Sequence, residues 1–365
     1  MAGCNLPPDN VVSDGATHFP WEDAAPMPDG MGTGGSGGSA GTNDAGASDG
    51  GTSDAGGDAS GPGPDGGDAS IPYSVVILPD TQYYSSTFPE IFDTQASWIL
   101  SERVAGNVSF VLTEGDLVDS DIPEQWMRAS HSLHMLDGLV PYVIVAGNHD
   151  YTVIMDRSSM INGYFPPSAF SPYPWFKGTF ESDRIENNYT LFDLPNGGGQ
   201  WLVLSLEFGP RDEVLAWADA IVKQHPTTPT MIVTHAYLYS DDHRYDRVAY
   251  PDQAWSPYDY VTGPPGTVND GEQMWQKLVR PNSNIRFVFS GHVLNDGVGR
   301  LTSTRDDGTV VHQILADYQV YDSGGNGYLR VMQFFPANRV VHVRTYSPYV
   351  DAFMTDADND FLLGY

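Results

Sequence analysis

The sequence contains a single cysteine, Cys4, which excludes an internal disulfide framework and any zinc module built on several thiolates. Lysine is scarce, with three residues in 365. No run of about 18 apolar residues occurs, which excludes a membrane-spanning helix. The sequence also lacks a Gly-x-Ser-x-Gly nucleophile elbow, and no Gly-Lys-Ser/Thr follows its glycine-rich part. Serine-hydrolase and P-loop chemistry are therefore not supported.

Acidic residues outnumber basic ones along the whole chain. The formal net charge is −30, and the first 72 residues hold 11 of the 47 acidic residues but no Lys or Arg. The remainder carries 36 acidic residues against 17 basic ones, a balance of −19. Such a field repels polyanions, so we expect no duplex nucleic acid as a partner. A metal cation, in contrast, would be attracted.

The first 70 residues are predicted to form a disordered tether. From 32 to 70 only Gly, Ser, Ala, Asp, Thr, Pro and one Asn occur, and such a segment cannot bury enough apolar surface to offset its ordering entropy. Ala2-Gly3-Cys4 resembles the end of a bacterial lipoprotein signal, so Cys4 is a candidate lipid anchor, although the charged and apolar regions that should precede it are not in this sequence. We expect a tether over 1–70 and a catalytic domain over 71–365 of an extracytoplasmic protein that is secreted, periplasmic or a surface lipoprotein.

From residue 71 the sequence alternates between strand and helix patterns. Short β-branched runs predict strands, and helical spacing that begins near Pro and ends before Gly predicts helices. The predicted strands are Tyr73 to Leu78, Val108 to Thr113, Pro141 to Ala146, Trp201 to Phe208, Thr230 to Thr234 and Ile285 to Ser290. The predicted helices are Pro89 to Ala105, Pro123 to Asp137, Asp212 to Gln224 and 271 to 280. This alternation predicts parallel strands joined by right-handed crossovers.

The C-terminal part has little helical pattern. Val310 to Leu315, Tyr328 to Phe335 and Val340 to Tyr346 are predicted to be antiparallel strands. Residues 151–200 and 236–270 are irregular, and we interpret the first of these stretches as a substrate wall over the strand ends. One part is thus rich in βα units and the other in strands. This pattern is consistent with two sheets packed face to face between helical layers.

Nearly every predicted strand of the βα part is followed by a residue that can bind a metal or carry a proton. Ligands of open α/β sheets bind beyond the carboxyl ends of the strands, so we expect these residues to lie together. Their oxygen and imidazole donors, without a thiolate, suit Mn, Fe or Zn. The residues are Asp80, Gln82, Asp116, Asn148, His149, His235 and His292.

Five motifs resemble, in order and spacing, those of the calcineurin-like metallophosphoesterase superfamily. They are Asp80-x-Gln82, Gly115-Asp116-x-x-Asp119, Gly147-Asn148-His149-Asp150, Thr234-His235 and Gly291-His292. The resemblance covers roughly residues 73 to 350, and ordered motifs are far more specific than any one of them. It implies an extracytoplasmic bacterial member of that superfamily, an α/β fold that is a four-layer α/β/β/α sandwich with two mixed sheets, and a dinuclear metal centre.

The resemblance also implies which residues bind the two ions. Asp116 would bridge them, and Asn148, His235 and His292 would complete one site. Asp80 would belong to the other site. Two cations neutralise phosphoryl oxygens and lower the pKa of a bound water, so that a metal-bound hydroxide can attack phosphorus directly. By the same resemblance, His149 would contact the phosphate and protonate the leaving oxygen, with Asp150 orienting it.

The second metal site departs from the family pattern at two positions. Gln82 stands where the first motif of the family has His, and Leu294 stands where the last motif has a second His. We therefore expect one tight ion and a second that is weaker or exchangeable, with Gln82 binding through its amide oxygen. Asn295, Asp296 and His243 are the alternatives for the ligand that Leu294 cannot supply.

Several other polar residues are weaker candidates for the site. We interpret His131 and His134 as packing or surface residues, Asp119 as a support for the loop or a ligand His, and Glu207 as a solvated loop carboxylate. The arginines of the irregular stretches are candidates for a phosphate contact; they are Arg157, Arg244 and Arg247.

The resulting hypothesis is a metal-dependent phosphoesterase that acts on a small-molecule phosphate ester. Phosphodiesters are favoured, because an acidic chain with three lysines disfavours dianionic monoesters and a weakened second site neutralises less charge. A phosphomonoesterase is the alternative within the enzyme class. A catalytically impaired metal-binding protein of the same fold is the alternative outside it. The presence of His149 with Asp150 argues against the impaired protein, since neither is needed merely to hold an ion.

Overall fold

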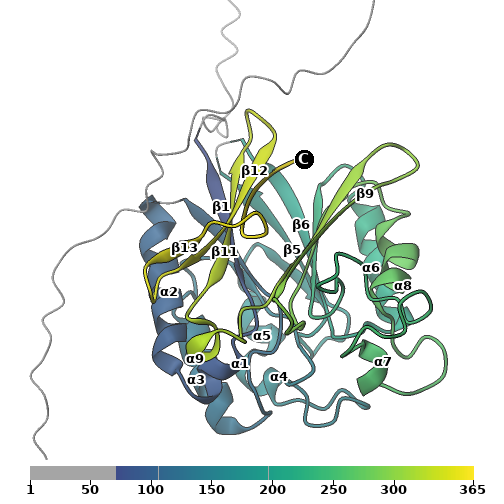
Figure 1. Cartoon of the computed structure of the whole chain (residues 1–365), viewed down its shortest axis with the longest axis horizontal. Helices are drawn as coiled ribbons and strands as arrows, with labels where there is room; N and C mark the ends of the chain where they lie inside the picture. The colour runs from purple at the N-terminus through teal and green to yellow at the C-terminus, as the bar shows by residue number, and fades with distance from the viewer. Residues whose placement is uncertain (1–70, 106, 196) are drawn as a thin grey trace, which may run out of the picture. The chain divides into compact units, whose positions relative to one another are not determined.

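A computed structural model of the protein describes residues 71–365 except Gly106 and Asn196. The predicted tether over 1–70, with the candidate anchor Cys4, lies outside the described residues. Two sheets, each with seven strands in the described part of the chain, pack face to face, and helices cover their outer faces (Figure 1). The predicted four-layer α/β fold with two mixed sheets is confirmed.

The first sheet has the strand order β13-β12-β11-β1-β2-β3, and β14 pairs with β12. Its parallel strands are β1 (Tyr73–Leu78), β2 (Val108–Thr113) and β3 (Tyr142–Val143). Its antiparallel strands are β11 (Leu329–Phe335), β12 (Val340–Ser347), β13 (Ala352–Met354) and β14 (Asp360–Gly364). The antiparallel pairing of β11 and β12 agrees with the sequence prediction.

The second sheet has the strand order β4-β5-β6-β7-β8-β10-β9. Its parallel strands are β6 (Gly199–Leu206), β7 (Thr230–Thr234), β8 (Ile285–Ser290) and β10 (Val310–Ala316). Its antiparallel strands are β4 (Phe176–Thr179), β5 (Asn188–Leu194) and β9 (Val298–Thr304).

Two sequence predictions about the second sheet are wrong. The segment that forms β10 was predicted to be antiparallel, but it runs parallel to β8 and is antiparallel only to β9. After β8 the chain first forms the edge strand β9 and then turns back, so the second reversal restores the direction of β8. Residues 151–200 were predicted to be irregular, yet they contain β4 and β5, and the alternating burial of β5 shows the period of a half-buried strand.

Helices cover the outer faces of both sheets. Over the first sheet lie α1 (Gln82–Ser86), α2 (Pro89–Ala105) and α3 (Pro123–His134), and over the second lie α6 (Asp212–Gln224), α8 (Gly271–Met274) and the π-helix η1 (Trp275–Val279) (Figure 1). The predicted helix 271 to 280 is therefore divided into α8 and η1. The remaining helices are single turns: α4 (Ile161–Tyr164), α5 (Pro167–Phe170), α7 (Pro257–Tyr260) and α9 (Asp322–Gly325). Among the described residues, no helix combines the length and the apolar character that crossing a bilayer requires.

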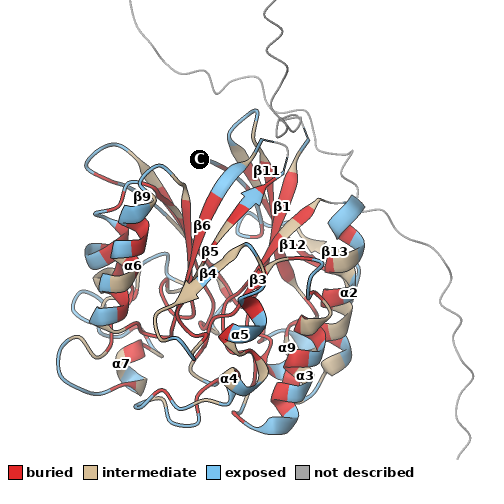
Figure 2. Cartoon of the chain, turned by 180° about the vertical axis from the view of Figure 1, so that it is seen from behind, coloured by how far each residue is buried: buried red, intermediate tan, exposed pale blue. Residues whose placement is uncertain are grey.

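The core lies between the two sheets. Alternate residues of each strand point inward, as Tyr73, Val75 and Ile77 of β1 do, and they meet the inward residues of the opposite sheet. Phe110 of β2 stacks on Phe192 of β5 with ring centroids 3.9 Å apart. Figure 2 shows red along much of the strands, with tan and pale blue at β4 and at several strand ends. A rigid double sheet therefore supports the loops at its ends.

The segment after β3 passes from the first sheet toward the second. The predicted strand Pro141 to Ala146 keeps strand pairing only at Tyr142–Val143. Beyond it, the Val145 amide donates to Thr113 Oγ1 at 3.2 Å, and the Ala146 carbonyl accepts from the Phe208 amide, also at 3.2 Å. The strand is shorter than predicted because its later hydrogen bonds go to a side chain and to the segment after β6. This crossing delivers residues 147–150 to the carboxyl ends of β2 and β7, next to Asp116 and His235.

The packing between the sheets predicts a large stability effect at Phe110. Replacing it with Ala would leave a cavity beside Phe192 and is expected to destabilise the protein by about 3–5 kcal/mol. Val104→Ala, on the exposed face of α2, is the control and should change stability by less than about 0.5 kcal/mol. Urea unfolding followed by tryptophan fluorescence measures both. Equal effects of the two substitutions would contradict the assignment of Phe110 to the core.

Candidate metal centre

Four side chains from both sheets meet at the carboxyl ends of the parallel strands. His235 follows β7 and is the centre of the group: its Nε2 lies 3.2 Å from Asp116 Oδ2, 3.1 Å from Asn148 Oδ1 and 3.1 Å from His292 Nδ1. The nearest donor atoms of Asp116, His235 and His292 all lie within 4.8 Å of one another. The structure thus brings together the residues that the resemblance assigned to one metal site.

The protonation of the two imidazoles follows from their outer contacts. His235 Nδ1 lies 2.7 Å from the Glu114 carbonyl, and His292 Nε2 lies 2.7 Å from the Trp255 carbonyl. A carbonyl oxygen can only accept, so each of these nitrogens must carry the proton. When the rings are neutral, His235 Nε2 and His292 Nδ1 therefore carry a lone pair and no proton. These two nitrogens face each other and the oxygens of Asp116 and Asn148. Acceptors this close, without a proton between them, fit a cation, and the outer carbonyls orient the rings as they do around bound metals.

Burial and neighbouring charges favour the metal-binding form of these groups. Burial, together with the adjacent His235, lowers the pKa of His292 to about 3, so this imidazole is neutral at neutral pH. Burial acts to raise the pKa of Asp116, but the charge and hydrogen bond of a protonated His235 outweigh it and hold that pKa below its ordinary value, and a metal cation in place of this proton would favour the carboxylate in the same way. A neutral imidazole next to an ionised carboxylate is the state in which both bind a metal.

Glycines in the motifs allow the ligand-bearing segments to approach each other. A Cβ at Gly147 would lie 2.1 Å from Asp116 Oδ1, and a Cβ at Gly291 would lie 2.1 Å from Asp80 Oδ1. Both distances are far shorter than any non-bonded contact, so any larger residue would displace a carboxylate. The two ligands next to these positions are themselves unusual, because Asp116 and His292 have positive φ angles of 45° and 78°.

His149 lies at the edge of the centre with its side chain 41% exposed. Its backbone amide donates to Asp116 Oδ1 at 2.9 Å, and its Nδ1 lies 2.8 Å from the Asp119 carbonyl. Because that carbonyl can only accept, Nδ1 carries the proton and Nε2 is left as the atom that can exchange one with a ligand. Asp119 therefore supports His149 through its main chain.

The structure does not place Asp150 behind His149. Its carboxylate is fully buried, and it accepts from the Gly147 amide at 2.8 Å and from the Val118 amide at 3.1 Å. The prediction that Asp150 orients His149 is therefore wrong for the side chains, because Asp119 occupies that position with its carbonyl. Asp150 instead ties the loop after β2 to the loop that carries Asn148 and so acts as a positioning residue.

Asp80 and Gln82 lie beside the four-residue group. The Asp80 carboxylate accepts from the His292 amide, with the shorter contact at 3.1 Å, and lies 3.9 Å from the His235 ring. Gln82 opens α1 and donates through Nε2 to Gln319 Oε1. Burial raises the pKa of Asp80 well above its ordinary value, and the carboxylate of Asp317 raises it further. Buried carboxyl groups therefore lie together on this side of the centre.

The expected substitutes for a ligand at Leu294 have contacts elsewhere. Asn295 is exposed and donates to the hydroxyls of Tyr239 and Ser240. Asp296 is also exposed and accepts from the amide of Val298, two residues along the chain. His243 is exposed beside Asp241, with 2.8 Å between its Nδ1 and the Asp241 carbonyl.

Sequence reasoning missed three residues of this cluster, Glu114, Asp317 and Gln319. All three are buried, and Gln319 Nε2 donates to Asp317 Oδ2 at 3.0 Å. The signal was present, since Asp317 and Gln319 follow β10 with the same Asp-x-Gln spacing that follows β1. This spacing indicates a shared site only if β10 runs parallel to β8, because an antiparallel strand would end at the opposite edge of the sheet.

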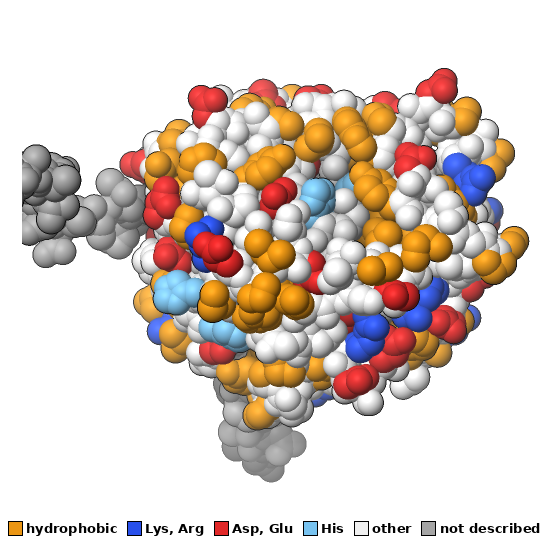
Figure 3. All heavy atoms as spheres, turned by 90° about the horizontal axis from the view of Figure 1, so that it is seen from below, with side chains coloured by type: hydrophobic (Ala, Val, Ile, Leu, Met, Phe, Trp, Pro, Cys, Tyr) orange, Lys and Arg blue, Asp and Glu red, His pale blue; other side chains and the backbone are white. Residues whose placement is uncertain are grey.

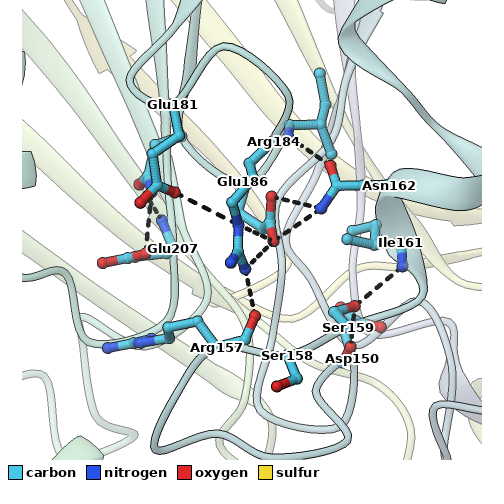
Figure 4. A network of polar contacts seen from close by, with 12 residues as sticks. Asp150, Arg157, Ser158, Ser159, Ile161, Asn162, Glu181, Arg184, Glu186 and Glu207 are labelled. Carbon is cyan, nitrogen blue, oxygen red and sulfur yellow. Dashed lines mark hydrogen bonds and ion pairs between the residues drawn. The ribbon is translucent and has the colours of Figure 1, made fainter.

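Arginines between residues 151 and 200 make contacts that hold the loops there together. Arg157 is buried and donates to the carbonyls of Phe208 and Gly209, so it is not free to bind phosphate. Arg184 pairs with Glu186, with 2.6 Å between Nη2 and Oε1, and also donates to the Arg157 carbonyl (Figure 4).

Glu207 is not the solvated loop carboxylate that the sequence suggested. It is buried, with Arg211 Nε 2.8 Å from its Oε1 and Asn187 Nδ2 3.0 Å from its Oε2. Although burial favours the neutral form, Arg157 and Arg211 hold the pKa of Glu207 below its ordinary value. An ionised carboxylate can remain buried here because two guanidinium groups compensate it.

The remaining sequence candidates lie outside the four-residue group. Arg244 pairs with Glu272 at 2.6 Å, and Arg247 lies over the Tyr258 ring. His134 lies 2.9 Å from Asp137, and the side chain of His131 is 71% exposed. These positions agree with structural or surface roles.

An open pocket of about 480 Å³ adjoins the centre. Figure 3, which views this end of the molecule, shows imidazole surface in a hollow among hydrophobic and uncharged polar side chains. Tyr260 forms part of its wall and packs edge-on against Phe208 and His292, with ring centroids 5.4 and 5.8 Å away. The residues that line the pocket are Asp119, Ser120, Asp121, Asn148, His149, Tyr151, Thr152, Ile154 and Tyr260.

Comparison with known proteins gives one similar sequence and several similar structures. Protein YvnB of Bacillus subtilis, described as uncharacterized, is 34% identical over 286 residues, which cover 76% of this chain and 20% of that protein. The chain thus spans about a fifth of the length of this relative. Purple acid phosphatase PPD1 from yellow lupin seeds is 13% identical, with a TM-score of 0.46 over 81% of this chain and 54% of that one.

Two further solved structures are similar at the level of shape. GAP50, described as the anchor in the inner membrane complex of Plasmodium, is 11% identical, with a TM-score of 0.42 over 80% of this chain and 89% of that one. The NAD nucleotidase NadN of Haemophilus influenzae is also 11% identical, with a TM-score of 0.38 over 78% of this chain and 49% of that one.

The sequence pattern of one family accounts for the strands and motifs together. The pattern described as calcineurin-like phosphoesterase matches residues 73–296, which is more than half of the chain. This stretch contains the five motifs and all four members of the metal-binding group. The family predicted from those motifs is confirmed, and the chain belongs to the calcineurin-like phosphoesterases.

Proposed function

We propose that the chain is a metal-dependent phosphoesterase that hydrolyses small phosphate esters and prefers phosphodiesters. The observation that supports this most directly is that His235 Nε2 lies within 3.2 Å of Asp116 Oδ2, Asn148 Oδ1 and His292 Nδ1, while the outer nitrogens of both rings face carbonyl oxygens. A Mn, Fe or Zn ion bound there would polarise a phosphoryl oxygen and lower the pKa of a coordinated water. The proposed ligands of this tight site are those four residues, with Asp80 beside them.

The pocket next to the centre is suited to a small ester. Asn148 and His149 form part of its wall, so a ligand in the pocket would lie next to both the metal-binding group and the exposed imidazole. Tyr151, Ile154 and Tyr260 supply apolar surface that can pack against an organic substituent. Its open volume of about 480 Å³ would accept a nucleoside-sized or aryl group.

The charges around the pocket support the preference for diesters. Its described lining includes Asp119 and Asp121 but neither Lys nor Arg. The lysines of the chain have partners elsewhere, as Lys223 has in Asp219 and Lys277 in Asp212. A dianionic monoester would meet two carboxylates without a compensating side-chain cation, whereas a diester carries one negative charge less. The preference therefore follows from electrostatics.

His149 is the proposed proton donor to the leaving oxygen. Its Nδ1 is held by the Asp119 carbonyl, which leaves Nε2 as the exchanging atom. An imidazole suits this role because its unperturbed pKa is close to neutral. The Asp150 carboxylate contributes indirectly, by binding the amides of Gly147 and Val118 and thereby fixing the loop that carries His149.

The substrate class is tested by comparing mono-, di- and triesters that share one leaving group. With added Mn²⁺, the full chain should hydrolyse bis(4-nitrophenyl) phosphate with a kcat/KM at least about tenfold above that for 4-nitrophenyl phosphate, a difference of about 1.4 kcal/mol in transition-state binding. A higher value for the monoester would support the phosphomonoesterase instead. Absence of turnover with every ester, despite bound metal, would favour the catalytically impaired metal-binding protein.

The role of His149 is tested by its dependence on the leaving group. His149→Asn should lower kcat by about 10²–10⁴-fold for an alkyl leaving group, which needs a proton, and much less for 4-nitrophenolate, which does not. Bound metal should stay unchanged. His131→Asn, on the exposed face of α3, is the matched control and should leave both rates unaltered. An equal loss with both leaving groups would contradict proton donation by His149.

The tight metal site is tested by His292→Ala. Loss of one direct ligand should weaken metal binding by more than the 10–100-fold typical of outer-shell partners, that is by more than about 100-fold, and activity should fall with it. Elemental analysis after gel filtration measures the bound metal, and circular dichroism checks the fold. His134→Ala is the control, since His134 bonds to Asp137 away from the centre. Full metal content in His292→Ala would exclude this residue as a ligand.

A further inference from the structure

A second group of buried oxygens lies next to the four-residue metal site. Asp80 follows β1 of the first sheet, and Asp317 follows β10 of the second, so their carboxylates come from opposite sheets. The side-chain amide of Gln319 lies between them, with Nε2 3.4 Å from Asp80 Oδ2 and 3.0 Å from Asp317 Oδ2. All three side chains are at least 95% buried.

Several oxygens of this group lack a hydrogen-bond donor. Gln82 is 3% exposed and donates to Gln319, but its own Oε1 has no partner among the described residues. Both carboxylate oxygens of Glu114, which is fully buried, likewise have none in the described chain. Buried oxygens without a donor are costly, and in native proteins they mark a missing water or ion. This observation is independent of the acidic character of the cluster.

The carboxylates of this group also favour a bound cation. The carboxylates of Asp80 and Asp317 lie on either side of one amide nitrogen, Gln319 Nε2, at 3.4 and 3.0 Å, so they are close to each other in a buried site. Arg330 is fully buried, and it donates to the Tyr318 hydroxyl and to the Asp358 carbonyl. A divalent ion bound between the carboxylates would remove the repulsion between them.

The Gln319 amide can present oxygen to such an ion if it and the Gln82 amide turn together. A carboxamide has the same shape after a half-turn about its last bond, which exchanges its nitrogen and oxygen. If Gln82 and Gln319 both make this turn, the hydrogen bond between them is kept with its direction reversed. Gln319 Oε1 then takes the place of Nε2 between Asp80 and Asp317, and three oxygens converge on one point.

We propose that Asp317, together with Asp80 and Gln319, forms a second cation site whose ligands are all oxygens, while Gln82 orients the Gln319 amide through their hydrogen bond. This site rests on the proposed metal centre, which lies beside it, and replaces the histidines expected at positions 82 and 294 with a different set of donors. Carboxylate and amide oxygens select hard ions, so Mg²⁺, Mn²⁺ or Ca²⁺ is expected here, in contrast to the imidazole-containing site next to it.

The loop that carries Leu294 supports this arrangement from behind. The Asp317 amide donates to the Gly297 carbonyl at 2.7 Å. Gly297 has φ of 71°, and a Cβ there would lie 1.6 Å from the Asp317 carbonyl oxygen. The loop thus supplies no ligand at position 294 but fixes the backbone that presents Asp317.

Manganese binding to the full chain tests the proposal without relying on activity. After removal of metal by chelation, equilibrium dialysis against Mn²⁺ should find two ions per wild-type chain, and electron paramagnetic resonance should show coupling between them. Asp317→Asn should retain one ion and weaken the second by at least about tenfold. Asp296→Asn, which removes an exposed carboxylate from the neighbouring loop, is the matched control and should bind two ions. Added Mg²⁺ should displace the second ion more readily than the first.

Each outcome of these measurements supports or rejects the second cation site. One ion per wild-type chain, or two ions in Asp317→Asn with unchanged affinity, would overturn the second site. If Asp317→Asn fails to fold, as judged by circular dichroism, Gln319→Leu removes an amide ligand instead and should show the same loss. Two ions bound without hydrolysis of any ester would leave this site standing and reject the proposed function. One bound ion together with normal ester hydrolysis would reject this second site and leave the proposed function standing.

Discussion

The constraint on which the structure depends is the burial of many acceptor atoms with few donors between them. His235 Nε2 and His292 Nδ1 face each other at 3.1 Å, and the outer nitrogens of both rings are already bonded to carbonyls. Asp116 and Asn148 add oxygens to the same point. Such a group is unfavourable unless a positive charge lies within it. The glycines at 147 and 291 and the strained ligands around them keep the group together despite this repulsion.

Two sheets, rather than one, build the centre. The parallel strands β1 and β2 end at the same edge as β7, β8 and β10, so residues far apart in the chain meet there. The segment after β3 connects the two layers, because its hydrogen bonds pass from Thr113 in the first sheet to Phe208 beyond β6 in the second. The packed core between the sheets holds these edges at a fixed separation. The ligands are therefore positioned before any ion or substrate binds.

Most of the other buried charges hold the surrounding loops in place. Asp150 binds backbone amides on both sides of the centre, and Glu207 is compensated by Arg157 and Arg211. These groups resemble catalytic residues in the sequence because they stand next to strand ends. Their partners show that they fix the backbone. The exposed His149, whose Nδ1 is held by a carbonyl, is the side chain left in a position to exchange a proton.

The sequence by itself determined the parts that local patterns encode. Hydrophobic period and flanking residues predicted β1, β2, α2, α6, β7 and β8 with their observed bounds, and the ordered motifs predicted the family and named the four residues that the fold brings together. Only the tertiary structure decided the direction of β10, the role of Asp150 and the place of Asp317. A strand carries the same period whichever neighbour it pairs with, so its sequence does not say at which edge it ends. Likewise, a carboxylate is read as catalytic or structural only from the atoms that it contacts, and those come from distant parts of the chain.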